Sequence, residues 1–327
     1  MKFLVVGLGS AGQRHARVLR KIFPDSKILV YRGQHKMGLI SPDLSSIEET
    51  IDPVDTYGLQ EIRNLPTGSS LDLTIICTPI ASHVEYVEKV IKESKKILIE
   101  KPLCRDVSEV RRFQAIVGAE SLVQIGYQHI FNPIFQKVIR LISQRSGGFT
   151  VELTFCEPLR MMNIFRDMRT HHLSQPNGGN AFLALSHEIE FLLTLFPELI
   201  GKISGFQSKS DPDSEVFDQT RIEGSFGSKS GSSIKLDIEL SYAEGRRVRT
   251  GKITNRTFEV SWDLFERYVK IQENGKIELE RFDYIGDDLI ERELQDLLGR
   301  TSFDKELERR LERAMEIVRI SGRLSES

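Results

Sequence analysis

Residues 2–12 read Lys2-Phe3-Leu4-Val5-Val6-Gly7-Leu8-Gly9-Ser10-Ala11-Gly12, a short apolar run that leads into glycines spaced as GxGxxG. The residues that follow, up to Phe23, carry apolar side chains at helical spacing. In a strand, turn and helix of this kind, the three glycines allow a tight turn, a close approach of a pyrophosphate and close helix packing. We therefore expect Gly7, Gly9, Ser10, Ala11 and Gly12 to bind a nucleotide cofactor at the N-terminus of the helix.

The first 125 residues alternate between apolar runs and amphipathic segments. We expect strands at residues 2–6, 27–31, 71–77, 96–100 and 121–126, with helices at 11–23, 82–93 and 107–117. Several of the strands are continuously apolar, which is typical of parallel strands buried on both faces. Residues 1–125 are therefore predicted to form a doubly wound, Rossmann-type parallel sheet. The segment 33–66, which contains three prolines, has no clear period.

After Tyr127 the pattern changes. It predicts a helix at 133–143, a strand at 149–157, a nearly apolar helix at 181–196, several strands between 201 and 281, and helices at about 288–298 and 304–324. Asn274-Gly275 is a hairpin signal. We expect residues 126–327 to form a second α/β domain with a large, mostly antiparallel open sheet.

The composition is that of a folded enzyme or binding protein. A length of 327 residues fits two domains, and a net charge of -2 gives no general attraction to nucleic acid or anionic membranes. The sequence has no signal-peptide pattern and no apolar run near the roughly 20 residues of a membrane span, so we expect a cytoplasmic protein. We expect no metal site. The three cysteines are scattered and lack CxxC spacing, and the adjacent His171-His172 pair has no carboxylate at ligand spacing.

The end of the second expected strand bears on the choice of cofactor. Sites that prefer NAD usually place an Asp or Glu there to bind the ribose 2′-OH. The chain instead reads Val30-Tyr31-Arg32-Gly33. We expect Arg32 to bind a 2′-phosphate and to favour NADP over NAD. The alternative is that Arg32 is a surface residue at a strand end.

Two further strand ends carry polar groups at the edge where ligands bind in open α/β sheets. Thr78 and Pro79 follow one strand, and His83 opens the next helix, where it either contacts the cofactor or caps and packs. Glu100-Lys101-Pro102 follows the apolar residues 97–99. A charge beside such a strand is costly unless it has a partner. We expect Lys101 to exchange a proton with a substrate hydroxyl, and Glu100 to orient it.

The second half of the chain offers His187, Glu188 and Glu190 on one otherwise apolar helix. A histidine in this setting is either a hydrogen-bonded core residue or a catalytic partner of Lys101. Arg160, Arg166 and Arg169 fall in an irregular stretch. Their guanidinium groups suit either a phosphate or carboxylate at a substrate mouth, or a solvated loop.

Taken together, these residues resemble the Gfo/Idh/MocA oxidoreductases, the family of glucose-fructose oxidoreductase and inositol dehydrogenase. The glycine motif and residues 185–190 are most similar to members from bacterial polysaccharide and nucleotide-sugar pathways. The resemblance spans nearly the whole chain and rests on Gly7 to Gly12, Thr78-Pro79 with His83, Glu100-Lys101-Pro102, Gly126-Tyr127-Gln128 with Phe131 and Pro133, and Gly178-Gly179 before Leu185-Ser186-His187-Glu188-Ile189-Glu190.

The resemblance implies an NAD(P)-dependent dehydrogenase that acts on a CH–OH group of a sugar, nucleotide sugar or cyclitol. It implies Lys101 and His187 as catalytic residues, and Tyr127, Arg166, Lys101 and His187 as substrate contacts. It also implies a closing helix packed on the first domain, and a homodimer or homotetramer formed through the C-terminal sheet.

The chain departs from the family pattern at two points. Members commonly carry an aspartate three or four residues before the helix histidine, where this chain has Ala184 and Leu183, and the frequent arginine before Phe131 is Ile130. Two alternatives therefore stay open. One is a non-catalytic NADP(H)-binding sensor or pathway partner, and the other is a glycosidase that works through transient oxidation.

Overall fold

The computed structural model describes residues 1–33, 37–42, 46–118, 121–158, 161, 180–210, 216–227, 233–243 and 245–326. The chain forms two compact units. The first comprises Met1–Gln128 and Ile285–Val318, and the second comprises His129–Tyr284 and Arg319–Ser327. The first unit thus includes a C-terminal segment in addition to the N-terminal region expected at 1–125.

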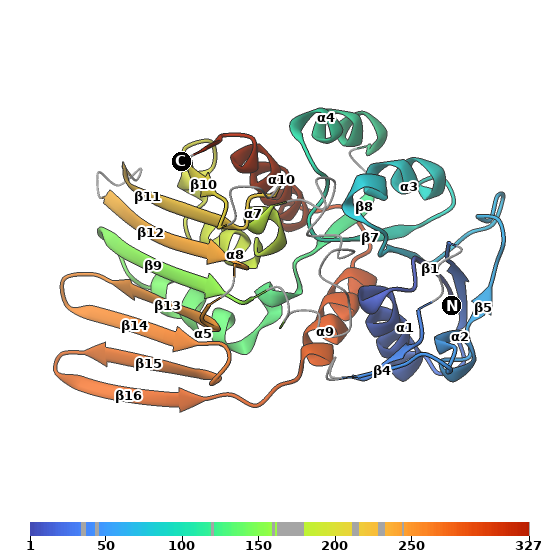
Figure 1. Ribbon diagram of the computed structural model, residues 1–327, viewed down its shortest axis with the longest axis horizontal. Helices are drawn as coiled ribbons and strands as arrows, with labels where there is room; N and C mark the ends of the chain where they lie inside the picture. Colours follow the sequence, from blue (N-terminus) through green and yellow to red (C-terminus); the bar gives the residue numbers. More distant parts are fainter. Residues whose placement is uncertain are drawn as a thin grey trace. The chain divides into compact units, whose positions relative to one another are not determined.

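The first unit is built on a parallel sheet, as predicted, with six strands where the sequence indicates five (Figure 1). When the six strands are numbered along the chain, their order across the sheet is 3-2-1-4-5-6. This is the order of a doubly wound sheet. The order reverses between β1 (Lys2–Val6) and β6 (Leu73–Ile76), and such sheets bind ligands at the carboxyl ends of the strands beside this point. Across the sheet the strands are β5 (Gln60–Glu61), β2 (Lys27–Tyr31), β1 (Lys2–Val6), β6 (Leu73–Ile76), β7 (Lys96–Glu100) and β8 (Leu122–Gly126).

Helices cover the sheet because its central strands are apolar on both faces. Phe3, Val5, Leu73 and Ile75 are fully buried. They share one core with apolar residues of α1 (Ser10–Ile22) and α9 (Gly286–Gly299). Burying each such side chain contributes roughly 1.5–3 kcal/mol. The remaining helices of this unit include α3 (His83–Val90), α4 (Val107–Ile116) and most of α10 (Lys305–Ser321).

The segment 33–66, which the sequence left unassigned, contains short elements. β3 (Leu39–Ile40) pairs with β4 (Ile47–Glu48), and α2 (Pro53–Thr56) begins after Asp52, whose side chain accepts a hydrogen bond from the Val54 N–H. β5 then adds the outermost strand of the sheet. A strand of two residues has no period from which it could be predicted.

The second unit contains a nine-stranded sheet, which is mostly antiparallel as predicted (Figure 1). Its parallel pairs are β9 (Phe149–Cys156) with β12 (Ser233–Ser241) and β10 (Gly205–Ser208) with β17 (Leu324–Glu326). Asn274 and Gly275 both have positive φ, 52° and 76°, as a type I′ turn requires. In sheet order the strands are β16 (Lys276–Arg281), β15 (Tyr268–Glu273), β14 (Phe258–Asp263), β13 (Val248–Thr254), β9 (Phe149–Cys156), β12 (Ser233–Ser241), β11 (Gln219–Gly227), β10 (Gly205–Ser208) and β17 (Leu324–Glu326).

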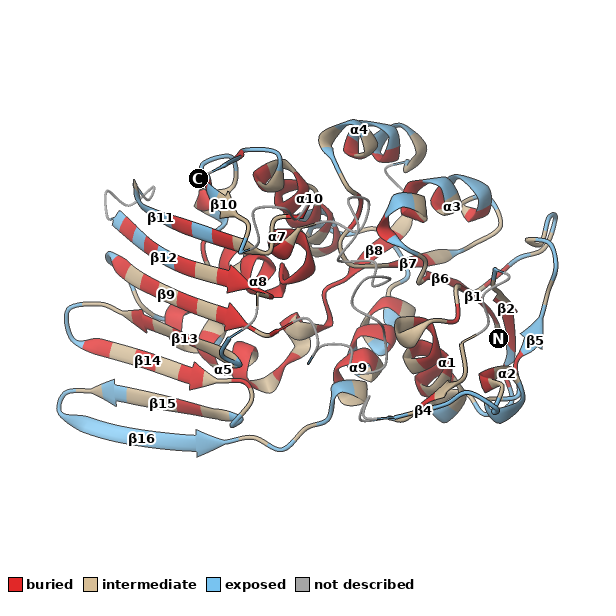
Figure 2. Ribbon diagram, viewed as in Figure 1, coloured by how far each residue is buried: buried red, intermediate tan, exposed pale blue. Residues whose placement is uncertain are grey.

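One face of this sheet is buried and the edge strand β16 is exposed along its length (Figure 2). Residues of β14 alternate between buried and half-buried, so that Trp262 points into the core. There it meets the edges of Phe135 from α5 (Pro133–Ser143) and Phe191 from α8 (His187–Leu195), whose rings stack 4.0 Å apart.

Two predicted helices differ from the structure. The helix expected at 181–196 is split into α7 (Ala181–Ala184) and α8, because the Ser186 hydroxyl donates to the Leu183 carbonyl and Ser186 begins a new helix. The helix expected at 304–324 ends at Ser321, before Gly322, and Leu324–Glu326 is strand β17. Leu324 is buried there beside Gly205.

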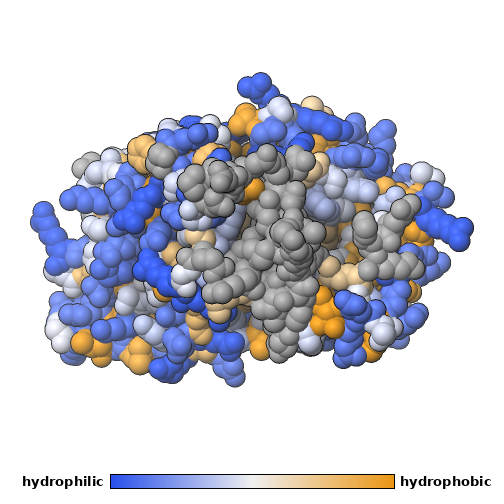
Figure 3. Space-filling view, viewed as in Figure 1, coloured by the Kyte–Doolittle hydropathy of each residue, from blue (hydrophilic) through white to orange (hydrophobic). Residues whose placement is uncertain are grey.

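No helix among the described residues is both long and apolar enough to cross a membrane. Among the residues coloured in Figure 3, hydrophilic ones cover most of the surface, and the hydrophobic ones lie scattered between them. Single exposed apolar side chains of this kind are ordinary.

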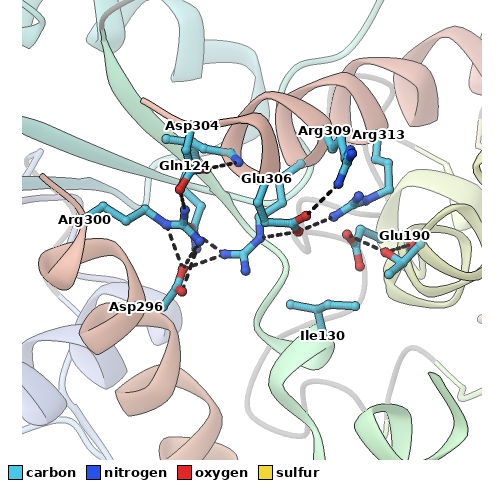
Figure 4. A network of polar contacts seen from close by, with 12 residues as sticks. Gln124, Ile130, Glu190, Asp296, Arg300, Asp304, Glu306, Arg309 and Arg313 are labelled. Atoms are coloured by element: carbon cyan, nitrogen blue, oxygen red, sulfur yellow. Dashed lines mark hydrogen bonds and ion pairs between the residues drawn. The ribbon is translucent and has the colours of Figure 1, made fainter. Parts of the chain in front are cut away.

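A network of charged side chains ties the C-terminal helices of the first unit to its sheet (Figure 4). Arg310 of α10 donates to Asp296 of α9 at 2.7 Å, to Glu306 at 3.2 Å and to Gln124 of β8 at 3.3 Å. Arg300 donates to the same Asp296 carboxylate at 3.1 Å. Because Arg310 and Gln124 are largely buried, this network fixes α10 against β8.

Candidate functional site

The turn between β1 and α1 has the geometry that its glycines predict. Gly7 has φ of 91°, and a Cβ there would lie 2.7 Å from the Cys77 carbonyl oxygen. A Cβ on Gly12 would lie 2.0 Å from the Gly7 oxygen, so only glycine lets the helix pack this closely on the turn. A Cβ on Gly9 would meet nothing within 4 Å. The space over Gly9 is open, as the approach of a pyrophosphate requires.

The N-terminus of α1 is suited to an anion. Gly9 is its N-cap, no side chain caps the helix, and no acidic residue lies in its first turn, which contains Ser10 and Ala11. The first N–H groups of a helix lack partners within the helix, and the helix dipole favours negative charge there. Residues 7–12 therefore form a cradle that fits the phosphates of a dinucleotide.

Thr78 and Pro79 follow β6 at the reversal point of the sheet, next to this cradle in sheet order. The Thr78 hydroxyl oxygen is buried and has no hydrogen-bond partner among the described residues. Buried hydroxyl groups are usually hydrogen-bonded. A polar ligand at this edge would supply the missing partner.

His83 links two loops at this edge. Its Nε2 lies 2.8 Å from the Thr78 carbonyl oxygen, and its Nδ1 lies 3.0 Å from the Pro102 oxygen and 3.3 Å from the Leu103 oxygen. The ring is buried, and burial lowers its pKa although the three carbonyls favour the charged form. Both nitrogens are occupied by backbone, so His83 holds the loop after β6 to the loop after β7.

Glu100 ends β7 and is held by a residue that the sequence analysis did not select. His15 of α1, which is fully buried, lies with Nε2 2.7 Å from Glu100 Oε1. Burial would raise the pKa of Glu100, but the His15 hydrogen bond and the nearby charges of His15, Lys101 and Arg14 bring it below its ordinary value. The sequence signal for His15 is a polar residue on the apolar face of the first helix.

Lys101 follows Glu100 directly, and its backbone N–H donates to Glu100 Oε2 at 3.2 Å. The carboxylate is thus fixed on one side by His15 and on the other by the backbone of the lysine. The peptide bond between Lys101 and Pro102 is cis. Lys101 therefore lies at the carboxyl end of β7, one strand from Thr78, as the sequence predicts.

Arg32 is placed at the end of β2, but its charge is engaged. Its two terminal nitrogens lie 2.9 and 2.6 Å from the Asp52 carboxylate oxygens, and one of them lies 2.8 Å from Glu61. These contacts raise the pKa of Arg32, with the Glu61 and Asp52 hydrogen bonds as the largest causes. The side chain is 4% exposed. From the sequence we expect Arg32 to be available to a 2′-phosphate. In the structure two carboxylates surround its guanidinium group.

In the second unit, His187 is the first residue of α8 and is buried. Its ring centroid lies 4.3 Å from that of His129, a residue of the 3-10 helix η2 (Gln128–Phe131). Glu188 pairs with Arg249 of β13 at 2.6 Å. Leu183 and Ala184, which stand where the family pattern has an aspartate, are both buried in the apolar core.

The other predicted site residues are placed only in part. Tyr127 is buried at the end of β8. Arg166, with Arg160, Arg169 and the His171-His172 pair, lies outside the described residues. Within the described ranges, no group of three or more His, Cys, Asp or Glu side chains could hold a metal ion. Cys77, Cys104 and Cys156 are free thiols.

The chain is similar to known oxidoreductases. The model of the Gfo/Idh/MocA family, described as an oxidoreductase family with an NAD-binding Rossmann fold, matches residues 1–127. Inositol 2-dehydrogenase of Rhizobium meliloti is 23% identical over 182 residues, which is 52% of each chain.

Two solved structures share the fold over the whole chain. A 3-ketoreductase from Actinomadura kijaniata, in complex with NADP and TDP-benzene, has a TM-score of 0.75 at 15% identity and covers 100% of this chain and 98% of its own. UDP-N-acetylglucosamine 3-dehydrogenase from Acidithiobacillus ferrooxidans has a TM-score of 0.67 at 18% identity and covers 98% and 97%.

The match to the curated relatives is partial, since the chain spans 52% of the first relative's length and 61% of that of an uncharacterized oxidoreductase from Escherichia coli. The residues that match the Gfo/Idh/MocA model, 1–127, are those that form the six-stranded parallel sheet of the first unit.

Proposed function

We propose that this chain is an NAD(P)-dependent dehydrogenase or ketoreductase that acts on a hydroxyl or ketone carbon of a sugar, nucleotide sugar or cyclitol. The observation that supports the proposal is the set of residues at the carboxyl ends of the central strands of the first sheet. There the open cradle at Gly9, the unpartnered Thr78 hydroxyl and Lys101 follow adjacent strands. The relatives supply the substrate class.

The chain's own residues provide the binding and the proton chemistry. Residues 7–12 bind the phosphates, and Thr78 binds a polar group of the cofactor at the reversal point. A nicotinamide cofactor held by these residues would supply hydride transfer to or from the substrate carbon. As the substrate C–OH becomes C=O, the Lys101 amine accepts the hydroxyl proton, and in the reverse direction it donates that proton. We also propose His187 as a catalytic residue, as the family resemblance implies.

Glu100 and His83 position this machinery. The short contact from His15 fixes the Glu100 carboxylate, and Glu100 in turn fixes the backbone of Lys101. His83 holds the Thr78 loop to the Pro102 loop. General acid–base catalysis depends on such placement within hydrogen-bond reach of the reacting atom.

The sequence analysis expects NADP, with NAD as the other cofactor; we propose from the surroundings of Arg32 that NAD(H) binds more tightly than NADP(H). The guanidinium of Arg32 is engaged by the carboxylates of Asp52 and Glu61 and is therefore not open to a 2′-phosphate. The carboxylates of Asp52 and Glu61 are about one-third exposed, whereas the Arg32 side chain is 4% exposed. A 2′-phosphate would meet repulsion here, while a ribose hydroxyl could donate to either carboxylate.

The first experiment is a substrate search with the full chain. Nucleotide sugars, aldoses and inositols are offered with NAD and NADP, and reduced nicotinamide is followed by its absorbance. We expect substrate-dependent reduction with at least one sugar or cyclitol. If both cofactors bind and no substrate of these classes exchanges a hydride, the dehydrogenase proposal fails.

A non-catalytic cofactor-binding sensor or pathway partner is the second candidate, and the apolar Leu183 and Ala184 favour it because they remove the usual acid near His187. It predicts cofactor binding without hydride exchange. A redox-assisted glycosidase would instead release sugar from a glycoside with no net change in the cofactor. The same assay separates all three outcomes when product release is measured in parallel.

Self-association through the nine-stranded sheet is also proposed. Ile277 and Leu279 on the edge strand β16 are 61% and 57% exposed, and Phe206 on β10 is 56% exposed. A second copy would remove this apolar surface from water. Analytical ultracentrifugation should therefore find a dimer or tetramer, and Ile277→Lys with Leu279→Lys should weaken it. A monomer at micromolar concentration would contradict the proposal.

A further inference from the structure

Next to His187, the second unit contains a cluster of polar side chains that the proposed reaction does not use. We call Glu188, Arg249 and His129 the Arg249 cluster. Its members come from α8, β13 and η2, and His129 contacts the ring of His187, with centroids 4.3 Å apart and planes tilted by 57°. The cluster is therefore the immediate support of the proposed catalytic histidine.

Arg249 is fixed on several sides. Its Nε donates to Glu188 Oε1 at 2.6 Å, and its guanidinium carbon lies 4.1 Å from the centroid of the Phe155 ring. The Arg249 and Glu188 side chains are 11% and 4% exposed. A second guanidinium nitrogen reaches His129 Nε2 at 3.4 Å. Since the ion pair and the ring contact orient the guanidinium, this second contact has a set direction.

That direction decides the tautomer of His129. A guanidinium group has only donors, so the nitrogen that it contacts must be an acceptor. Nε2 of His129 must then carry the lone pair, and the proton of the neutral ring must be on Nδ1.

We propose that Arg249, held by Glu188, is a positioning residue that fixes His129 as the Nδ1–H tautomer, and that the ordered His129 ring fixes the ring of His187. The part of this proposal that concerns catalysis rests on the proposed function of His187. The tautomer does not, because it follows from the Arg249 contact alone.

The charges around the pair agree with a neutral His129. Arg249 and Glu188 cancel each other, and a proton on His129 Nε2 would meet the guanidinium. Phe135 of α5 faces the His129 ring at 6.3 Å without charge. Lys137 of the same helix pairs with Glu280, and Glu190 of α8 accepts a hydrogen bond from Thr194.

The Arg249 cluster also lowers the stability of the fold, because it buries polar atoms without hydrogen-bond partners in the part of the chain that the structure describes. This argues against a role in stability alone. One oxygen of Glu188 and one nitrogen of Arg249 are buried with no hydrogen-bond partner among the described residues. Leaving such buried groups unpaired lowers the stability of the folded protein. A buried ion pair with unpaired atoms is weak support for stability, and retention for orientation is the better explanation.

The test is nitrogen NMR of the full chain labelled with ¹⁵N-histidine, at a pH where both rings are neutral. Loss of a signal in His129→Gln assigns His129. We expect Nδ1 protonated and Nε2 unprotonated in the parent protein. A parent protein with the His129 proton on Nε2, or with both tautomers equally populated, overturns the proposal without any variant of Arg249.

Variants of Arg249 then test the cause. Arg249→Gln should populate the other tautomer, and Arg249→Lys, which keeps a donor-only group, should restore part of the parent spectrum. Arg247→Gln is the matched control, because Arg247 also pairs with a carboxylate, Glu157, and lies over an aromatic ring, Phe265, but is half exposed. An unchanged His129 spectrum in folded Arg249→Gln would overturn the proposal.

If the substrate search finds turnover, kcat supplies a second readout. Arg249→Gln should lower kcat with little change in KM, by no more than the roughly 10²–10⁴-fold that general acid–base catalysis supplies. A parental kcat would refute the link to His187 while the tautomer result stands. If no turnover is found, the proposed function fails and the NMR result decides the tautomer by itself.

Discussion

Two guanidinium nitrogens of Arg32 donate hydrogen bonds to the two carboxylate oxygens of Asp52, at 2.9 and 2.6 Å. Asp52 Oδ1 also accepts the N–H of Val54 at the start of α2, which fixes the carboxylate in place. Arg32 also donates a hydrogen bond to Glu61. From the sequence we expect this cation to bind a 2′-phosphate, but in the structure it pairs with two carboxylates.

The cofactor preference follows from this arrangement. We predict that NADH binds the parent protein more tightly than NADPH, and that Asp52→Asn combined with Glu61→Gln reverses the order by freeing Arg32. One charge-assisted contact contributes about 1.5–3 kcal/mol, or roughly tenfold to a hundredfold in Kd. Calorimetric titration of both cofactors measures the effect.

Asp55→Asn is the control for this prediction, because Asp55 is an exposed acid on α2. It removes one negative charge from the same region without touching the Arg32 contacts. Tighter binding of NADPH to the parent protein, or an equal response to Asp55→Asn, would mean that these carboxylates do not select the cofactor.

Gly9→Ala and Gly12→Ala should separate binding from folding. A Cβ on Gly9 has open space and φ there is -74°, so the variant should unfold at the parental temperature but bind cofactor weakly. A Cβ on Gly12 would meet the Gly7 oxygen at 2.0 Å, and we expect a loss of about 1–3 kcal/mol in unfolding free energy. Thermal unfolding and cofactor titration of both variants distinguish them, and parental affinity in Gly9→Ala would exclude phosphate binding at this turn.

Lys101→Ala should lose turnover but keep cofactor binding. If Lys101 exchanges the substrate proton, kcat should fall by roughly 10²–10⁴-fold while the Kd of the cofactor changes little. Lys95→Ala, which removes an exposed lysine near the start of β7, is the control. A parental kcat in Lys101→Ala would remove Lys101 from the mechanism.

Glu293 of α9 should make the fold less stable as pH rises. It is 1% exposed. Burial, followed by the charge of Glu100, raises its pKa well above the ordinary value of 4.5. Between these two pKa values the folded protein holds a proton that the unfolded chain has lost, so the free energy of unfolding falls with pH.

Glu293→Gln removes this titration. The difference in unfolding free energy between variant and parent should favour the variant increasingly above about pH 4.5, by about 1.4 kcal/mol per pH unit until the folded pKa is reached. Urea unfolding at several pH values measures this slope, with Glu308→Gln as an exposed control. Parallel pH profiles of variant and parent would show that Glu293 is ionised in the folded protein.

The sequence by itself determined the elements whose residues repeat a local pattern. The apolar runs of β1 and β7, the glycines at 7, 9 and 12, and Asn274-Gly275 each specify a local backbone conformation, and the structure contains each of them. Lys101 could be named as a candidate catalytic residue because it closely follows the apolar run of β7. Neighbours along the chain were enough in these cases.

Only the tertiary structure decided which distant side chains meet. His15 reaches Glu100 across 85 residues, Arg249 reaches His129 across 120, and Arg32 is neutralised by Asp52 and Glu61 from a segment without a readable period. The strand at Leu324 also depends on a distant partner, Gly205. Hydrogen bonds and ion pairs act over a few ångströms in space, and separation along the chain carries no information about them.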